Sequence, residues 1–186
     1  MRYGMKLGAK AAMTSQAKMD VNTTIGLYKK AAALDRFNAM YRIDLAQIMN
    51  KELKETKDRK YYDGVMEQIS LIRKYEPHNH QFTSVICNIY LSLGKFEEAS
   101  ELVDFRAQDE PLIAQSYKSK IDVNFEIVKY YAKNNTMQEA IPYLREIAEA
   151  KEQIERINAE LQEPIVLDEN TLEKVEASLK ALEAMK

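Results

Sequence analysis

The chain has 186 residues, of which 46% are hydrophobic and 30% charged, so it can form both an apolar core and a charged surface. Its formal net charge is −2, with 27 basic and 29 acidic residues spread along the sequence. No segment is basic enough to indicate the basic patch that nucleic-acid binding requires. The single cysteine, Cys87, excludes an internal disulfide framework and a cysteine-based metal cage.

The composition predicts an all-α fold, because only five Gly and four Pro interrupt a sequence rich in strong helix formers. No apolar run reaches the roughly 18 residues of a membrane-spanning helix, and the N-terminus lacks a signal-like hydrophobic region. We therefore expect no membrane insertion by this segment and, if the chain is complete, a cytoplasmic protein. In chain order the expected helices cover residues 5–18, 21–35, 38–56, 58–76, 79–93, 95–109, 111–133, 137–162 and 170–185.

Local signals support several of these boundaries. Thr136 with Glu139, and Asn170 with Glu173, have the spacing of a capping box. Pro142 falls inside the helix expected over 137–162. It should either kink this helix or delay its start.

The segment between Pro77 and Pro111 carries a repeat signal, because the interval between these two prolines equals the period of a known helical repeat. Small residues at Cys87 and Ala99 would let two helices approach closely, and Gly94 permits a left-handed turn between them. With Tyr90 and the terminal proline, these positions resemble a tetratricopeptide repeat (TPR). The resemblance implies a right-handed solenoid of helical hairpins that binds proteins or peptides.

The flanking segments match the same repeat with longer helices. The expected organisation is a single domain over 1–186, which begins with a first helix pair at about 5–37 and ends with a capping helix over 165–186. Between them lie an elongated repeat over 38–77, the regular repeat over 78–111 and a second elongated repeat over 112–162. Residues that fit the repeat's packing positions in the flanking segments are Thr24, Tyr28, Ala31, Leu45, Ala46, Met49, Val65, Ile69, Ile72, Ile127, Val128, Tyr131 and Ala140, with Asn135 at a turn.

In this family the first helix of each pair lines a concave groove, where fixed helix positions face the ligand. Carried over to this sequence, the resemblance implies an amphipathic groove for a partner protein or peptide, with Asn88 at its centre. The groove would be lined by Met40, Ile43, Gln47, Asn50, Lys51, Gln81, Ser84, Asn88, Leu91, Ser92, Asp122, Phe125, Lys129 and Lys133.

The last two helices have the a/d spacing of packed helices. The residues at this spacing are Ile147, Ile154, Ile157 and Leu161 in one helix and Leu172, Val175, Leu179 and Leu182 in the other. A helical array needs a terminal helix that covers its last apolar face. We therefore expect the last helix to be a cap, and a homodimer formed through residues 170–185 is the alternative.

No enzyme, metal or cofactor is indicated. The sequence has no phosphate-binding glycine loop, nucleophile elbow or HExxH pair. His78 and His80 are the only histidines, and their position beside Pro77 favours a turn and a helix start over a metal site. Cys87 is expected to be a buried packing residue.

A second interpretation is that this chain is the soluble tail of a larger bacterial membrane protein. The phrase ALDRFNAMYRIDLAQ, from Ala33 to Gln47, resembles repeat regions that follow the membrane part of bacterial O-antigen ligase or polymerase-like proteins. That resemblance implies an extracytoplasmic soluble domain used for assembly or positioning.

Overall fold

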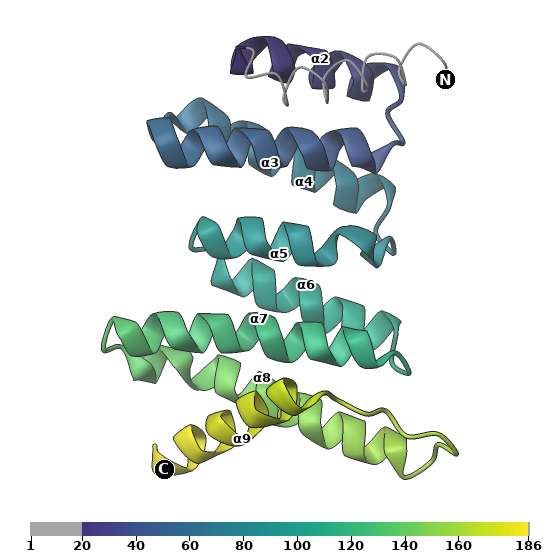
Figure 1. Ribbon diagram of the computed structural model, residues 1–186, viewed down its shortest axis with the longest axis vertical. Helices are drawn as coiled ribbons and strands as arrows, with labels where there is room; N and C mark the ends of the chain where they lie inside the picture. Colours follow the sequence, from purple (N-terminus) through teal and green to yellow (C-terminus); the bar gives the residue numbers. More distant parts are fainter. Residues whose placement is uncertain (1–19, 186) are drawn as a thin grey trace. The chain divides into compact units, whose positions relative to one another are not determined.

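The computed structural model describes residues 20–185, and over this range it contains α-helices, one short 3-10 helix and no strand (Figure 1). The all-α expectation is therefore confirmed. The elements are α2 (Val21–Leu34), α3 (Ala39–Thr56), α4 (Arg59–Tyr75), η1 (His80–Phe82), α5 (Thr83–Ser92), α6 (Phe96–Asp109), α7 (Ala114–Lys133), α8 (Met137–Asn158) and α9 (Glu169–Ala184). The helix expected over 5–18 lies outside the described residues.

Contacts divide the chain into two compact units, one ending at Ile89 and the other beginning at Tyr90, so α5 contains the boundary. In the N-terminal unit α3 contacts both α2 and α4. In the C-terminal unit α7 contacts α6, α8 and α9, and α9 also contacts α8. Each unit thus has a central helix that contacts at least two other helices of that unit.

Two turns in the C-terminal unit have the same hydrogen-bond pattern. After α5, Gly94 has a φ of 71°, and the N–H of Lys95 donates to the Tyr90 carbonyl at 2.9 Å. After α7, Asn135 has a φ of 56°, and the N–H of Thr136 donates to the Tyr131 carbonyl at 3.0 Å. Both are Schellman turns, in which a left-handed residue ends the helix and reverses the chain. The expected left-handed roles of Gly94 and Asn135 are confirmed.

A second kind of turn recurs after α2, α4 and α6. Its first residue is Asp35, Glu76 or Glu110, with φ values of −131°, −135° and −122°. In each case the N–H three residues later donates to this residue's carbonyl at 3.1 Å. The next helical segment follows directly, so one local geometry ends three different helices.

Small side chains predicted at packing positions are buried. Cys87, Ala99 and Ala140 are completely inaccessible to solvent, which confirms the expected burial of these positions. The apolar core of the C-terminal unit includes Ile121, Leu144 and Ile147, which are also fully buried. Helix packing therefore follows the predicted apolar stripes.

Some local expectations need correction. Pro142 does not delay α8, which already begins at Met137. The Thr136 side chain makes no capping hydrogen bond, although its carbonyl accepts from the Glu139 N–H at 3.0 Å. Asn170 is not a cap, because Asp168 caps α9 by accepting from the Thr171 N–H at 3.1 Å.

The helix expected over 137–162 is shorter than predicted, since α8 ends at Asn158. The Asn158 amide donates to the Ile165 carbonyl at 2.9 Å and accepts from the Ile165 N–H at 2.6 Å. These two bonds fold the connecting segment back over the end of the helix. Ile165 is consequently buried in the core of the C-terminal unit.

Candidate partner-binding surfaces

The sequence-predicted groove residues of α3 divide into exposed and buried ones. Met40, Gln47 and Lys51 are exposed, and their spacing along the helix places them on one face. Ile43 and Asn50 are only 3% and 7% exposed, so their side chains do not face solvent. The expectation that these two face a ligand is therefore wrong, because their face of α3 is packed inside the unit.

The remaining groove residues of the N-terminal unit are exposed. Gln81 lies in η1, and Ser84 and Asn88 lie on α5. Met40 and Gln81 line the same hollow of about 400 Å³, together with Phe37, which is 57% exposed. The structure thus brings together groove residues from α3 and η1, between which the whole of α4 intervenes in the sequence.

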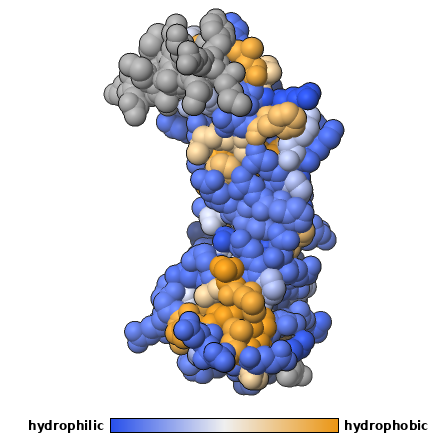
Figure 2. All heavy atoms as spheres, turned by 90° about the vertical axis from the view of Figure 1, so that its right-hand side faces the viewer, coloured by the Kyte–Doolittle hydropathy of each residue, from blue (hydrophilic) through white to orange (hydrophobic). Residues whose placement is uncertain are grey.

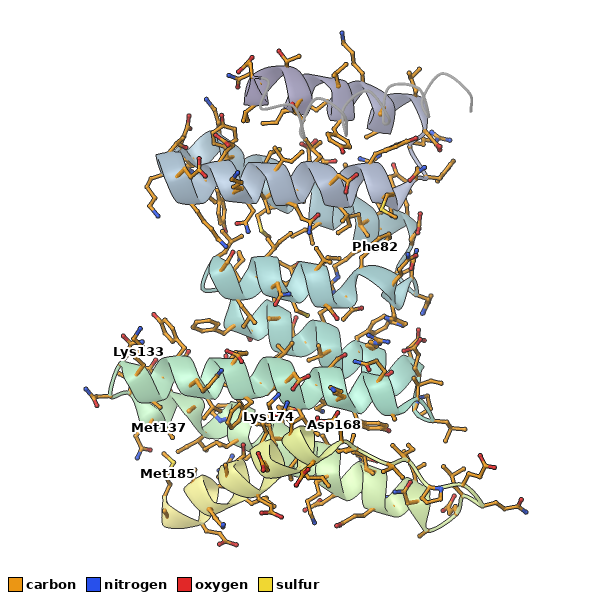
Figure 3. All side chains as sticks on the ribbon, in the orientation of Figure 1. Phe82, Lys133, Met137, Asp168, Lys174 and Met185 are labelled. Carbon is orange, nitrogen blue, oxygen red and sulfur yellow. The ribbon has the colours of Figure 1, made fainter. Side chains whose placement is uncertain are left out.

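In the C-terminal unit the groove residues of α7 meet the last helix. Asp122 forms an ion pair with Lys174 of α9, and Lys118 of α7 pairs with Asp168 at 2.5 Å (Figure 3). Phe125 is half-buried against the core of this unit. Helix α9 therefore covers part of the α7 face that was predicted to bind a ligand.

The other end of that face remains open. Lys129 is exposed, pairs with Glu126 at 2.5 Å and lies 5.8 Å from the centroid of the Phe125 ring. Lys133 is exposed at the last turn of α7 (Figure 3). At the end of α5 that belongs to this unit, Leu91 is half-buried and Ser92 is exposed.

A second candidate surface, which the sequence reasoning missed, is centred on Lys120 of α7. Its ammonium donates to Asp104 of α6 at 2.5 Å and pairs with Glu146 of α8 at 2.8 Å. Only 7% of the Lys120 side chain is exposed, against 36% and 35% for the two carboxylates. One buried cation therefore joins two helices that are both packed on α7.

The charge of Lys120 is stabilised by these contacts. Burial acts to lower its pKa, but the hydrogen bonds and charges of Asp104 and Glu146 outweigh burial and raise the pKa above the usual lysine value. Lys120 is therefore a structural ammonium ion at neutral pH, and it has no free electron pair for nucleophilic or base chemistry.

Two adjoining clefts lie along this ion pair. One has a volume of about 450 Å³ and the other about 320 Å³, and both are lined by Asp104 and Glu146. We call the combined feature the α6–α8 groove. Besides these two residues it is lined by Glu97, Ser100, Glu101, Ala107, Gln108 and Pro111, by Tyr117 and Lys120, and by Pro142, Tyr143, Glu149, Ala150, Gln153 and Ile157.

The sequence does carry a signal for the buried lysine. Tyr117, Ile121, Asn124 and Val128 are all buried and follow the i, i+4, i+7, i+11 spacing of one helix face. Lys120 falls on that same stripe, where a solvated lysine would not be expected.

The N-terminal unit has a comparable cleft of about 270 Å³ that is lined by Arg42, Lys29, Glu67 and Gln68. The guanidinium of Arg42 donates to the Gln68 side-chain oxygen at 3.2 Å and to the Arg36 carbonyl at 3.1 Å. Its Nε has no hydrogen-bond partner within the described part of the chain. Arg42 is 7% exposed, so this is also a buried cation.

Sites for chemistry are not evident in residues 20–185. Within this range no group of three or more His, Cys, Asp or Glu side chains is arranged to hold a metal ion. His78 lies in the turn after α4, and His80 begins η1, as predicted. No helix in the same range combines the length and the apolar character needed to cross a bilayer.

Comparison of the sequence with models of known protein families and with curated proteins finds no match.

Proposed function

We propose that this chain is a TPR-like helical-repeat scaffold that binds a protein or peptide and catalyses no reaction. The observation that carries the proposal is the recurrence of one turn geometry after three helices, α2, α4 and α6. The turns that begin at Asp35, Glu76 and Glu110 have the same hydrogen bond, and the interval from Glu76 to Glu110 equals the interval between Pro77 and Pro111. Sequence-distant segments that share one local geometry are typical of a repeat array.

The Schellman turns support the same interpretation. The interval from Gly94 to Asn135 has the same length as the interval from the Asp35 turn to the Glu76 turn. After each Schellman turn a fully buried alanine, Ala99 or Ala140, follows at the same offset. A tight turn followed by a small buried residue allows the second helix to pack closely on the first. The two turns therefore share one construction.

Helix α9 has the properties of a capping helix. Val175 is buried, and Leu179 and Leu182 pack against the core of the C-terminal unit, while Glu173 and Glu176 are exposed. This side-chain distribution covers the apolar face of α7 and α8 and presents a charged outer face to water. It supports a cap in preference to a dimerising helix, although Leu172 remains 49% exposed.

We propose that the partner binds an exposed surface in each unit. In the N-terminal unit this surface is formed by α3, η1 and α5, and in the C-terminal unit by the open end of α7. In the N-terminal unit, Met40 and Phe37 supply apolar contact around the hollow that Gln81 also lines. Gln47 and Asn88 add exposed amides, which can both donate to and accept from a bound backbone. The corrected set of binding residues no longer includes Ile43 or Asn50.

A photo-crosslinking experiment tests the proposal. A photoreactive phenylalanine analogue at Asn88 should give a discrete crosslinked product in cells of the source organism. The matched control is the same analogue at Ser70, which is exposed on α4 in the same unit. The partner is then purified and its affinity measured for wild-type protein, Asn88→Ala and Ser70→Ala.

If Asn88 is buried on binding, its loss should weaken the complex by roughly 1–3 kcal/mol, and Ser70→Ala should have no effect. Equal crosslinking from positions 88 and 70, or equal affinity of both variants, would contradict the proposed surface.

A further inference from the structure

The α6–α8 groove is strongly acidic. Five carboxylates line it, from Glu97, Glu101 and Asp104 on α6 and Glu146 and Glu149 on α8. Lys120 already pairs with Asp104 and Glu146. Within the described part of the chain the other three carboxylates form no ion pair, and all three are exposed. The groove therefore carries negative charge that no cation of the described residues compensates.

The two ends of the groove differ in their chemistry. At one end Tyr143 and Pro142 lie beside Glu97 and Glu101. Aromatic rings next to carboxylates favour cationic side chains, which contact both the ring face and the negative charge.

At the other end Pro111, Tyr117 and Ile157 form an apolar wall. The turn that begins at Glu110 continues through Pro111 into Leu112 and Ile113, which are 59% and 49% exposed. Figure 2 shows apolar side chains gathered on the C-terminal unit, on the side where this turn lies. This end is therefore suited to an apolar side chain.

From this arrangement we propose that the α6–α8 groove binds a basic segment of a partner protein, with arginine or lysine side chains beside Glu97, Glu101 and Glu149. An apolar side chain of the same segment inserts between Pro111 and Ile157. This site is separate from the surface of the proposed function, because it is formed by α6, α8 and the opposite side of α7.

Dimensions and charge both limit the occupant. From Glu97 to Pro111 the α6 side of the groove spans about 20 Å at about 1.5 Å per helical residue. An extended peptide covers that distance with about six residues. The phosphates of a nucleic acid would be repelled by the carboxylates, so a cationic polypeptide is the macromolecule that matches the groove.

The probe is a set of four fluorescein-labelled heptapeptides, three designs and the reversed sequence of the first, used with the full-length chain at low ionic strength. The first carries two arginines near its N-terminus and a leucine near its C-terminus, and is also made with the reversed sequence. The second replaces the arginines by glutamates, and the third replaces the leucine by serine. Fluorescence anisotropy gives the affinities, and ¹H–¹⁵N NMR shift changes locate the binding site.

We expect saturable binding of the first peptide, with shifts concentrated in α6 and α8, and binding at least about fivefold weaker for the third peptide. The acidic peptide should not bind. The double variant Glu101→Lys/Glu149→Lys should weaken the first peptide at least about tenfold. The control Glu55→Lys/Glu176→Lys makes the same charge change at exposed sites outside the groove and should change the affinity much less.

The proposal is overturned if no member of the set binds saturably, or if the two double variants have equal affinities. It is also overturned if the NMR shifts map outside α6 and α8. Circular dichroism of both variants checks that the helices remain folded, so that a loss of binding is assigned to the groove. None of these results depends on a partner for Asn88, so this test and the crosslinking test can fail separately.

Discussion

Among the described residues, each of the two units buries one lysine or arginine, but the units stabilise this cation differently. Within the described residues, Arg42 of the N-terminal unit donates to neutral acceptors, the Gln68 side chain and the Arg36 carbonyl, and lies 5.9 Å from the centroid of the Tyr75 ring. Lys120 in the C-terminal unit is held between two carboxylates of different helices. Both residues are nearly inaccessible, at 7% and 6% exposure.

The difference shows that burial of charge serves two purposes in this chain. Around Arg42 the long apolar stem fills space, while the guanidinium donates to neutral acceptors and its Nε has no hydrogen-bond partner in the described residues. Around Lys120 the charge itself joins α6 to α8, and without it two carboxylates would face each other across the groove. A buried pair that loses one partner is more costly than a site that loses a poorly satisfied cation.

The largest effect should therefore come from Lys120→Met. This variant leaves Asp104 and Glu146 without their cation and should lower the free energy of unfolding by about 2–4 kcal/mol. The matched variant Arg42→Met keeps an apolar side chain of similar length and should cost no more than about 1 kcal/mol. Urea denaturation gives the stabilities, and amide exchange in α7 and α3 assigns each loss to its unit. Equal losses would show that the two cations are equivalent.

The turns should respond in opposite directions in the two units. The α3–α4 turn contains Lys57 at a φ of 59°, whereas the α5–α6 turn has Gly94 at 71°. A β-carbon in this region is unfavourable, so Lys57→Gly should stabilise by about 0.5–1 kcal/mol and Gly94→Ala should destabilise by about 1 kcal/mol. Thermal unfolding of both variants measures the effect. A destabilised Lys57→Gly protein would mean that the lysine side chain contributes more than its backbone costs.

The smallest effect concerns the acid sensitivity of α9. Its cap, Asp168, accepts hydrogen bonds from Lys118 and from the Thr171 N–H, which lower its pKa from 3.8 to about 2. A depressed pKa stabilises the fold fully above the unfolded value and loses that contribution as the pH falls from about 4 to about 2. Amide exchange at the start of α9 should therefore accelerate over this range.

In Asp168→Asn the same amides should already exchange faster at neutral pH, and the pH dependence attributed to the carboxylate should disappear. A wild-type and a variant protein with the same pH profile would show that this cap does not hold α9.

Much of the fold could be predicted from particular residues. Gly94 and Asn135 are among the few residue types that adopt a left-handed conformation readily, so their turns could be placed in advance. Buried alanines at positions 99 and 140 follow from the need for close helix approach. The boundaries of most helices follow from the apolar periodicity and from Pro77 and Pro111, which interrupt it.

The rest depends on contacts that a single sequence does not specify. Ile43 and Asn50 were assigned to the groove because the resemblance to the repeat implies these helix positions, but the orientation of α3 against its neighbours decides which face is buried. The role of Lys120 depends on carboxylates of two other helices, which only the packing of α6 and α8 on α7 brings together. The Asp168 cap was missed because Asn170 offered the better short-range motif.

The central claim is that the chain binds a partner through the exposed faces of α3 and α5 and through the open end of α7. Hydrogen–deuterium exchange of the full chain, with and without the partner captured through position 88, tests it most directly. We expect slower exchange on partner binding in peptides covering residues 39–56, 80–92 and 125–133, and no change in α4. Protection confined to α4, α6 or α8, or no protection anywhere, would contradict the proposed function.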